Sequence, residues 1–68
     1  MTRYLVTKCS ISGTERYGIT VMEGQDEMDC VDDIASTLQE TLSLAALLQE
    51  NGVAAVHFRD VLEDWLAR

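Results

Sequence analysis

The sequence predicts an α+β fold: a two- to three-stranded antiparallel sheet, opened by an N-terminal hairpin and followed by two helices packed on one face. Three observations predict it. Apolar and polar residues alternate over residues 3–11 and 16–23, a period typical of half-buried strands. Apolar residues recur at helical spacing over residues 36–51 and 57–67. The 68 residues are 47% hydrophobic and 25% charged, which indicates one globular domain over residues 1–68.

The first two strands are predicted from their β-forming residues. In the first strand we expect Leu5 to face the core, and in the second we expect Ile19 and Val21 to do so. The polar link over residues 12–15 is short and contains Gly13, which tolerates a positive φ. A β-hairpin is therefore the simplest connection between the two strands.

A third strand over residues 28–34 completes a β meander over residues 1–34. Its aspartates are poor strand formers, so we expect it at an edge of the sheet, where charge discourages further pairing. In a meander, Cys9 and Cys30 lie on the two outer strands, about 9–10 Å apart. That distance exceeds the reach of a disulfide, so both cysteines are predicted to be free thiols.

The first helix is predicted over residues 36–51. Ser36 is a good N-cap, Gln39 stands three residues later as in a capping box, and Gly52 follows as a stop signal. Its predicted core face carries Leu38, Leu42 and Leu48.

The second helix is predicted over residues 57–67. One face is apolar and is expected in the core, namely Phe58, Val61, Leu62 and Trp65. His57 begins this helix, where a structural role at the helix start is more typical than catalysis. No nucleophile–base pair or phosphate-binding loop is present, so we expect neither an enzyme nor a bound cofactor.

The charge balance limits the partners. Twelve acidic residues against five basic ones give a net charge of -7. Nucleic acids and anionic membranes are bound through clustered Lys and Arg, so neither is expected as a partner. The N-terminus lacks the apolar core of a signal peptide, which predicts a cytoplasmic protein.

An acidic tract with no Lys or Arg between its members is the first candidate partner-binding feature, namely Glu23, Asp26, Glu27, Asp29, Asp32 and Asp33. It suits docking of a basic protein partner. The alternative is a small divalent-metal- or ligand-binding protein, although the spacing is not that of a calcium loop and no metal ligand is assigned. A simple solvated edge is the third interpretation.

Leu47 is the second candidate partner-binding feature. It lies nearly opposite the predicted core face of the first helix, which makes the end of that helix apolar almost all round. Burial of Leu47 by the second helix or by a second copy of the chain would explain it. We therefore expect a non-enzymatic interaction or regulatory module with an unknown protein partner. Self-association as a homodimer is one form that this interaction can take.

Two segments carry motifs, Tyr17-Gly18-Ile19-Thr20-Val21 and Val56-His57-Phe58-Arg59-Asp60-Val61-Leu62-Glu63-Asp64-Trp65-Leu66. They resemble a family of small proteins from Gram-positive, largely anaerobic bacteria that has no assigned function. Members of that family look like Val-His-Leu-x-Asp-Val-Val-Glu-Asp-Phe-Leu in the second segment, and Ala55 stands where they often have proline. The resemblance implies a shared fold but no catalytic or ligand residues.

Overall fold

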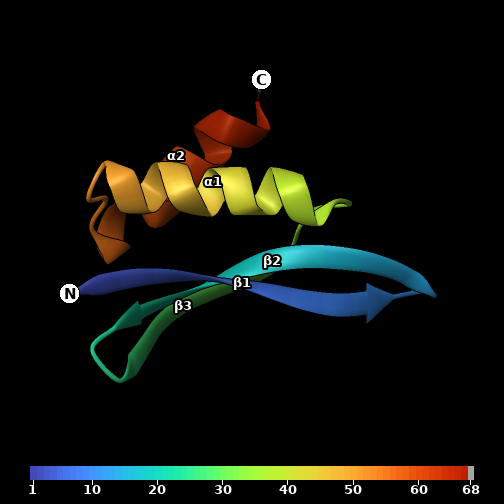
Figure 1. Cartoon of the computed structure of the whole chain (residues 1–68), viewed down its shortest axis with the longest axis horizontal. Coiled ribbons are helices and arrows are strands. Elements are labelled where there is room, and N and C mark those ends of the chain that lie inside the picture. Colours follow the sequence, from blue (N-terminus) through green and yellow to red (C-terminus); the bar gives the residue numbers. More distant parts are fainter. Residues whose placement is uncertain (68) are drawn as a thin grey trace.

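The structure is a computed structural model that describes residues 1–67. It confirms the predicted α+β fold, a three-stranded antiparallel sheet of order β1-β2-β3 followed by two helices on one of its faces (Figure 1). The elements are β1 (Thr2–Ile11), β2 (Thr14–Glu23), β3 (Asp26–Ala35), α1 (Leu38–Glu50), a 3-10 turn η1 (Ala55–His57) and α2 (Phe58–Leu66).

The β1–β2 hairpin is regular from end to end. Its residues pair without interruption from Thr2 opposite Glu23 to Ile11 opposite Thr14. The two-residue turn has positive φ at both Ser12 (52°) and Gly13 (79°). This is the pattern of a type I′ turn, whose twist matches that of the strands it joins.

The β2–β3 pairing is irregular at two places. Val21 lies opposite Asp29 but the next residue, Met22, lies opposite Glu27, which leaves Met28 as an extra residue on β3. The second register shift lies between Tyr17 and Ile19 of β2. Such bulges bend a strand and redirect its side chains.

Gly18 makes the second irregularity possible. A Cβ atom at this position would collide with the carbonyl oxygen of Val31 and with the main chain of Asp32. Since backbone atoms cannot move aside as a flexible side chain can, any larger residue would push β3 away from β2. The glycine of the first sequence motif is therefore required by the close approach of two strands.

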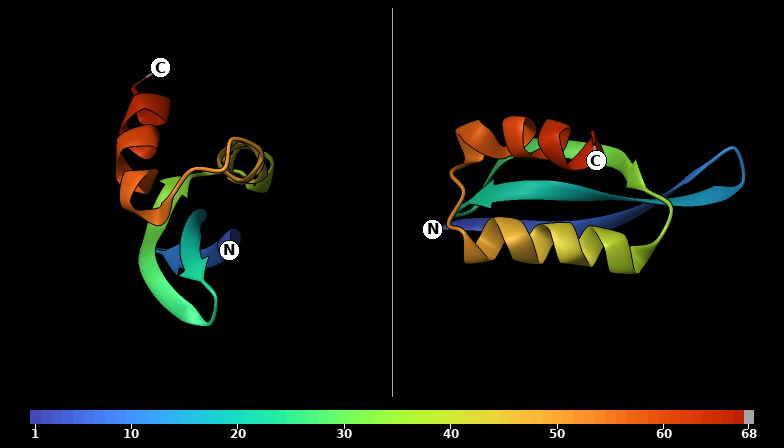
Figure 2. Two further views of the ribbon diagram at one scale, coloured as in Figure 1. Left: turned by 90° about the vertical axis from the view of Figure 1, so that its left-hand side faces the viewer. Right: turned by 90° about the horizontal axis from the view of Figure 1, so that it is seen from above.

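The two helices pack over different parts of the sheet. Seen from above and from the end, α1 runs along β1 and α2 runs along β3 (Figure 2). The core lies between the sheet and these helices and consists of Tyr4, Ile19, Val21, Ile34, Ala35, Leu44, Ala45, Leu48, Phe58 and Leu62. Val61 and Trp65, also predicted for the core, are half-buried against it.

The predicted core residue of β1 is wrong. Leu5 is 42% exposed, whereas its neighbours Tyr4 and Val6 face the helices. Both alternating sets of β1 contain apolar residues, so alternation could not show which set is covered. The covered set contains Tyr4, whose ring packs 5.9 Å from that of Phe58, measured between centroids.

The predicted core face of α1 is also wrong for two of its three residues. Leu38 and Leu42 are 46% and 51% exposed. The buried stripe is instead Thr41, Leu44, Ala45 and Leu48. The hydroxyl of Thr41 donates to the carbonyl oxygen of Thr37 at 3.0 Å, so its burial leaves no polar group unpaired.

The N-cap of α1 is Thr37, one residue later than the predicted Ser36. Its hydroxyl accepts a hydrogen bond from the amide of Glu40 at 3.3 Å. α2 begins at Phe58, after the 3-10 turn. Among residues 1–67 no helix has both the length and the apolar character to span a membrane.

The outer edge of β1 is covered at one end by the Gln49 side chain from α1. Its amide oxygen accepts from the Tyr4 main-chain N–H at 3.2 Å, and its amide nitrogen donates to the Thr2 carbonyl at 2.9 Å. The Tyr4 hydroxyl in turn donates to the carbonyl of Val53, after α1. These contacts fix the helical layer on the sheet.

Candidate functional site

The six carboxylates of the acidic tract do not form one cluster in the structure. Glu23 lies 3.4 Å from the terminal ammonium of Met1 and accepts from the Thr2 hydroxyl. Asp33 pairs with Arg16, and Asp29 pairs with Arg59. Half of the tract is therefore held in structural contacts.

The other three members of the tract are Asp26, Glu27 and Asp32, and none has an ion-pair partner among residues 1–67. Asp32 accepts a hydrogen bond from the Cys30 thiol. Nowhere in this part of the chain do three or more His, Cys, Asp or Glu side chains converge as metal ligands would. The geometry thus gives no support to the alternative of a divalent-metal site.

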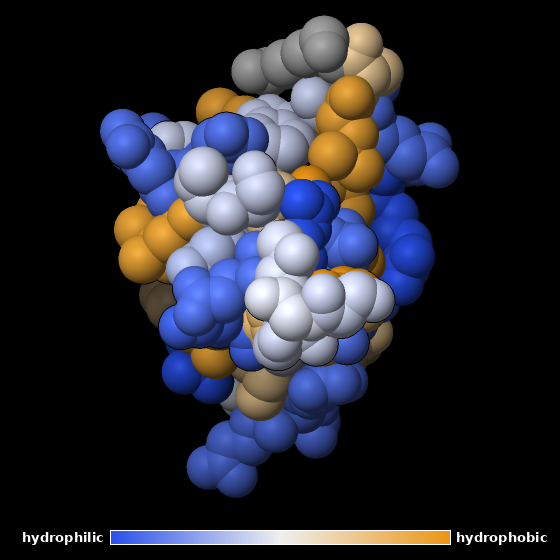
Figure 3. Space-filling view, turned by 90° about the vertical axis from the view of Figure 1, so that its right-hand side faces the viewer, coloured by the Kyte–Doolittle hydropathy of each residue, from blue (hydrophilic) through white to orange (hydrophobic). Residues whose placement is uncertain are grey.

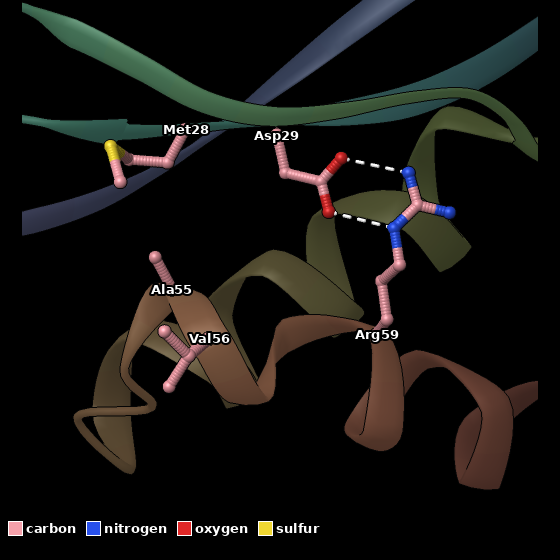
Figure 4. A pocket seen from close by; sticks show the side chains of 5 residues that line it. All are labelled: Met28, Asp29, Ala55, Val56 and Arg59. Carbon is pink, nitrogen blue, oxygen red and sulfur yellow. Dashed lines mark hydrogen bonds and ion pairs between the residues drawn. The ribbon is translucent and has the colours of Figure 1, made fainter.

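An open groove of about 240 Å³ lies between β3 and the beginning of α2. Figure 4 shows its walls, with Met28 and Asp29 on β3 opposite Ala55, Val56 and Arg59. The two largest apolar side chains of the groove are also strongly exposed, Met28 by 55% and Val56 by 80%. One end of the groove is thus apolar, and the other is closed by an ion pair.

That ion pair is bidentate. Arg59 donates from Nε and Nη2 to the two carboxylate oxygens of Asp29, both at 2.8 Å, and the main-chain N–H of Cys30 donates to the same carboxylate at 2.8 Å. The hydrogen bonds from Arg59, with a smaller contribution from Cys30, lower the pKa of Asp29. The pair connects α2 to β3 and neutralises the positive charge of Arg59.

The irregular pairing of β3 builds this groove. Asp29 lies opposite Val21, whose side chain is in the core, so Asp29 points toward the helices. The extra residue Met28 lies beside Asp29 on β3 and lines the groove with it. The sequence placed Asp29 in the acidic tract but did not predict the groove. Two features of the sequence were available as signals for it: Met28 is an apolar residue among carboxylates, and a short apolar run precedes His57.

Other candidate residues lie outside the groove. Leu47 is half-buried in the single chain, which weakens the need for a partner there. The Thr20 hydroxyl donates to the Cys30 sulfur, which lowers the pKa of this thiol. The hydrogen bond to Asp32, burial and nearby negative charge outweigh that effect and raise the pKa of Cys30 overall, which disfavours a reactive thiolate.

The model of a family of unknown function, DUF6514, matches residues 1–68. The chain belongs to this family. A search of curated proteins and a search of solved structures each found no match. In this DUF6514 chain the two sequence motifs have different positions. The first lies in the central strand and supplies Gly18, whereas the second covers α2 and supplies Val56 and Arg59 to the groove.

The end of the molecule that carries the β1–β2 hairpin shows polar side chains with apolar ones scattered among them (Figure 3). Scattered apolar residues are normal on protein surfaces. The groove differs because exposed apolar side chains, Met28 and Val56, lie on both of its walls.

Proposed function

We propose that this protein is a non-enzymatic, cytoplasmic interaction module of a Gram-positive bacterium that binds a basic, apolar segment of a partner protein in the β3–α2 groove. The observation that supports it is the pair of exposed apolar side chains, Met28 and Val56, on opposite walls of that groove. An apolar side chain of the partner inserted between them would remove both from water. Burying one side chain of this size contributes about 1.5–3 kcal/mol.

The charges around the groove favour a basic partner. Asp26 and Glu27 directly precede Met28, and Asp60 follows Arg59 in the first turn of α2. Within residues 1–67, the cation that lines the groove is Arg59, and Asp29 neutralises it. Lys or Arg flanking the apolar anchor would therefore meet unbalanced negative charge, which speeds encounter and orients the segment.

The side chains in the walls suit a binding role. Methionine is flexible and polarisable, so Met28 adapts to anchors of different shape. The Asp29–Arg59 pair holds one end of the groove in one geometry, because two parallel hydrogen bonds fix a guanidinium more firmly than one. Apolar walls with a few precisely placed polar groups that fix orientation are typical of binding sites.

The test uses the purified chain and synthetic peptides of defined composition. A peptide with Leu flanked by Lys and Arg is compared with a peptide in which Glu replaces the basic residues, and with one in which Ser replaces Leu. Amide and methyl chemical shifts of Met28, Ala55 and Val56 are followed by NMR during titration. We expect shifts with the basic, apolar peptide alone, weakening as salt is raised.

Val56→Lys should abolish these shifts, since it removes an 80% exposed apolar side chain from the wall and places a positive charge against the basic peptide. Leu42→Lys is the matched control, because Leu42 is an exposed apolar residue, at 51%, on α1 and away from the groove. Equal binding of the acidic peptide, or equal loss with both variants, would contradict the proposal.

A further inference from the structure

The outer edge of β1 is covered only at its beginning. Main-chain groups of successive strand residues point alternately to the two sides of a strand. Gln49 bonds the Tyr4 N–H and the Thr2 carbonyl from outside the sheet, so the even-numbered residues of β1 present their main-chain groups outward. Within residues 1–67, the N–H and C=O groups further along this edge have no hydrogen-bond partner; they belong to Val6, Lys8 and Ser10.

The outer edge of β3 is protected more fully. It is acidic, and it carries the extra residue Met28. The Asp29 carboxylate also accepts the outward N–H of Cys30. Charges and bulges at an edge strand discourage pairing with another chain. By contrast, β1 is regular throughout and contains no acidic residue. Of the two edges, β1 is therefore the one that can accept a further strand.

Two exposed leucines of α1 lie along the same edge. Leu42 and Leu38 precede Gln49 by about two and three helical turns, so the three side chains are on one side of α1. α1 runs antiparallel to β1, and its Gln49 is at the start of the edge (Figure 2). At 1.5 Å per helical residue, Leu42 and Leu38 lie about 10 and 16 Å further along. At about 3.3 Å per strand residue, these positions are beside Val6 and Lys8.

The surroundings of this edge are apolar and uncharged. Leu42 and Leu38 are 51% and 46% exposed, and Leu5, on the other face of β1, is 42% exposed. The ammonium of Lys8 is 3.0 Å from the carboxylate of Glu15, which neutralises it and holds it toward β2. An uncharged strand with apolar side chains on one face is therefore complementary to this edge, whereas the β3–α2 groove favours basic residues.

We propose that the β1 edge over residues 6–10 binds an extended, uncharged segment of a partner protein, which adds to the sheet as a fourth, antiparallel strand. Main-chain hydrogen bonds give affinity in this mode of recognition, and alternate side chains give specificity. The bound residues opposite Val6 and Lys8 turn their main-chain groups to β1 and their side chains toward Leu42 and Leu38. These alternate positions of the partner segment are apolar.

A second copy of the chain does not fit this edge. Antiparallel pairing of two β1 edges needs a two-fold axis perpendicular to the sheet, which places both α1 helices on the same face. Because α1 runs along β1 (Figure 2), the two helix axes would then be separated by about one strand spacing, roughly 4.8 Å. Packed helices need about 8–10 Å. A segment without its own helical layer meets no such clash.

Hydrogen exchange measured by NMR tests the pairing, with the purified chain and a capped peptide of alternating Val and Thr. The peptide should slow exchange of the Val6 and Lys8 amides several-fold and leave that of the Tyr4 amide, already held by Gln49, unchanged. N-methylation of the valines removes the N–H groups that face β1 and should abolish the protection. N-methylation of the threonines, whose N–H groups face away, should preserve it.

A pair of variants tests the contribution of α1. Leu42→Asp should weaken peptide binding by at least about ten-fold, because it replaces an apolar contact by a charge. Leu66→Asp is the matched control, since Leu66 is 53% exposed on α2, and it should bind as wild type. Circular dichroism confirms the fold of both variants. Leu42→Asp should leave the groove shifts of Met28 and Val56 with the basic peptide unchanged, which separates this test from that of the proposed function.

Three results would overturn the proposal. One is equal binding of the two N-methylated peptides, and another is equal loss of binding in Leu42→Asp and Leu66→Asp. The third is no peptide binding by a wild-type chain that associates with itself in sedimentation velocity and loses this association in Leu42→Asp. That result would assign the β1 edge to a second copy of the chain.

Discussion

The two outer strands pair with β2 in different ways. β1 matches it residue by residue through a tight turn, whereas β3 departs from it at two places. The edges differ as well. Gln49 covers two main-chain groups of β1, and on β3 the Asp29 carboxylate accepts the N–H of the following Cys30.

The two halves support different features of the molecule. The regular β1–β2 half carries the contacts that fix the helices, through Tyr4 and Gln49. The irregular β3 carries the side chains that line the groove, Met28 and Asp29. Bulges are common beside functional sites because they redirect side chains without disturbing the rest of the sheet. The following substitutions test this difference between the two halves.

Gly18→Ala should have the largest effect, because its Cβ meets the main chain of Val31 and Asp32 and forces the irregular half apart. We expect a loss of about 3 kcal/mol or more in the free energy of unfolding, which is comparable to the total stability of domains of this size, about 3–5 kcal/mol. Thermal melts followed by circular dichroism measure it. Thr7→Ala, directly opposite Gly18 on β1, is the control and should melt close to wild type. An unchanged melt for Gly18→Ala would show that β3 does not approach β2 this closely.

Gln49→Ala should weaken the regular half by removing both hydrogen bonds to the β1 edge. At about 0.5–1.5 kcal/mol per bond, the expected loss is about 1–3 kcal/mol. Hydrogen exchange of the Tyr4 amide should become faster. Gln39→Ala, an exposed glutamine at the other end of α1, should leave that exchange rate unchanged; a similar acceleration there would point to general loosening of the helix.

Asp29→Asn should reduce stability at neutral pH and flatten its loss in acid. The pKa of Asp29 is lowered from its ordinary value of 3.8 in the folded chain. The stability it contributes is therefore present above pH 3.8 and is lost as the pH falls below that value toward the folded pKa. Melts between pH 7 and pH 2 measure it. Asp26→Asn should leave the melting temperature at pH 7 unchanged; equal effects of both would mean that total charge, not the pair with Arg59, is responsible.

Ser12→Asn should have the smallest effect, and a stabilising one. Ser12 is in the left-handed region, with φ of 52°, and asparagine before glycine is preferred in a type I′ turn. We expect a gain of a few tenths to about 1 kcal/mol, because the left-handed region costs other residues about 1–2 kcal/mol. Ser10→Asn, within β1, should not stabilise. A lower melting temperature for Ser12→Asn would contradict the turn type.

Patterning predicted the fold class, the three strands and both helices to within a few residues. It did not identify the buried face of an element whose apolar residues occupy more than one face. Leu5 and Tyr4 are equally acceptable core residues in β1, and α1 has leucines on several sides. In α1 the covered face includes Thr41, whose hydroxyl is paired within the helix, and no apolar pattern includes a threonine.

The candidate site was predicted only in part. The tract was recognised as a charged feature, but Asp29 and Arg59 are 30 residues apart and meet only because β3 has an extra residue. Bulges depend on tertiary contacts such as the one at Gly18, and a single sequence carries no periodic signal for them. The groove could therefore not be derived from spacing alone.

The contacts of Tyr4 and Thr2 with Gln49 and Val53 join residues 45 to 49 positions apart. During synthesis from the N-terminus, β1 and β2 leave the ribosome long before these anchors exist. The future core side of the sheet therefore stays uncovered until Gln49 and Val53 have emerged as well. Assembly of the two layers follows the synthesis of both hairpins and of α1, and chaperones have their opportunity to act on the uncovered sheet in that interval.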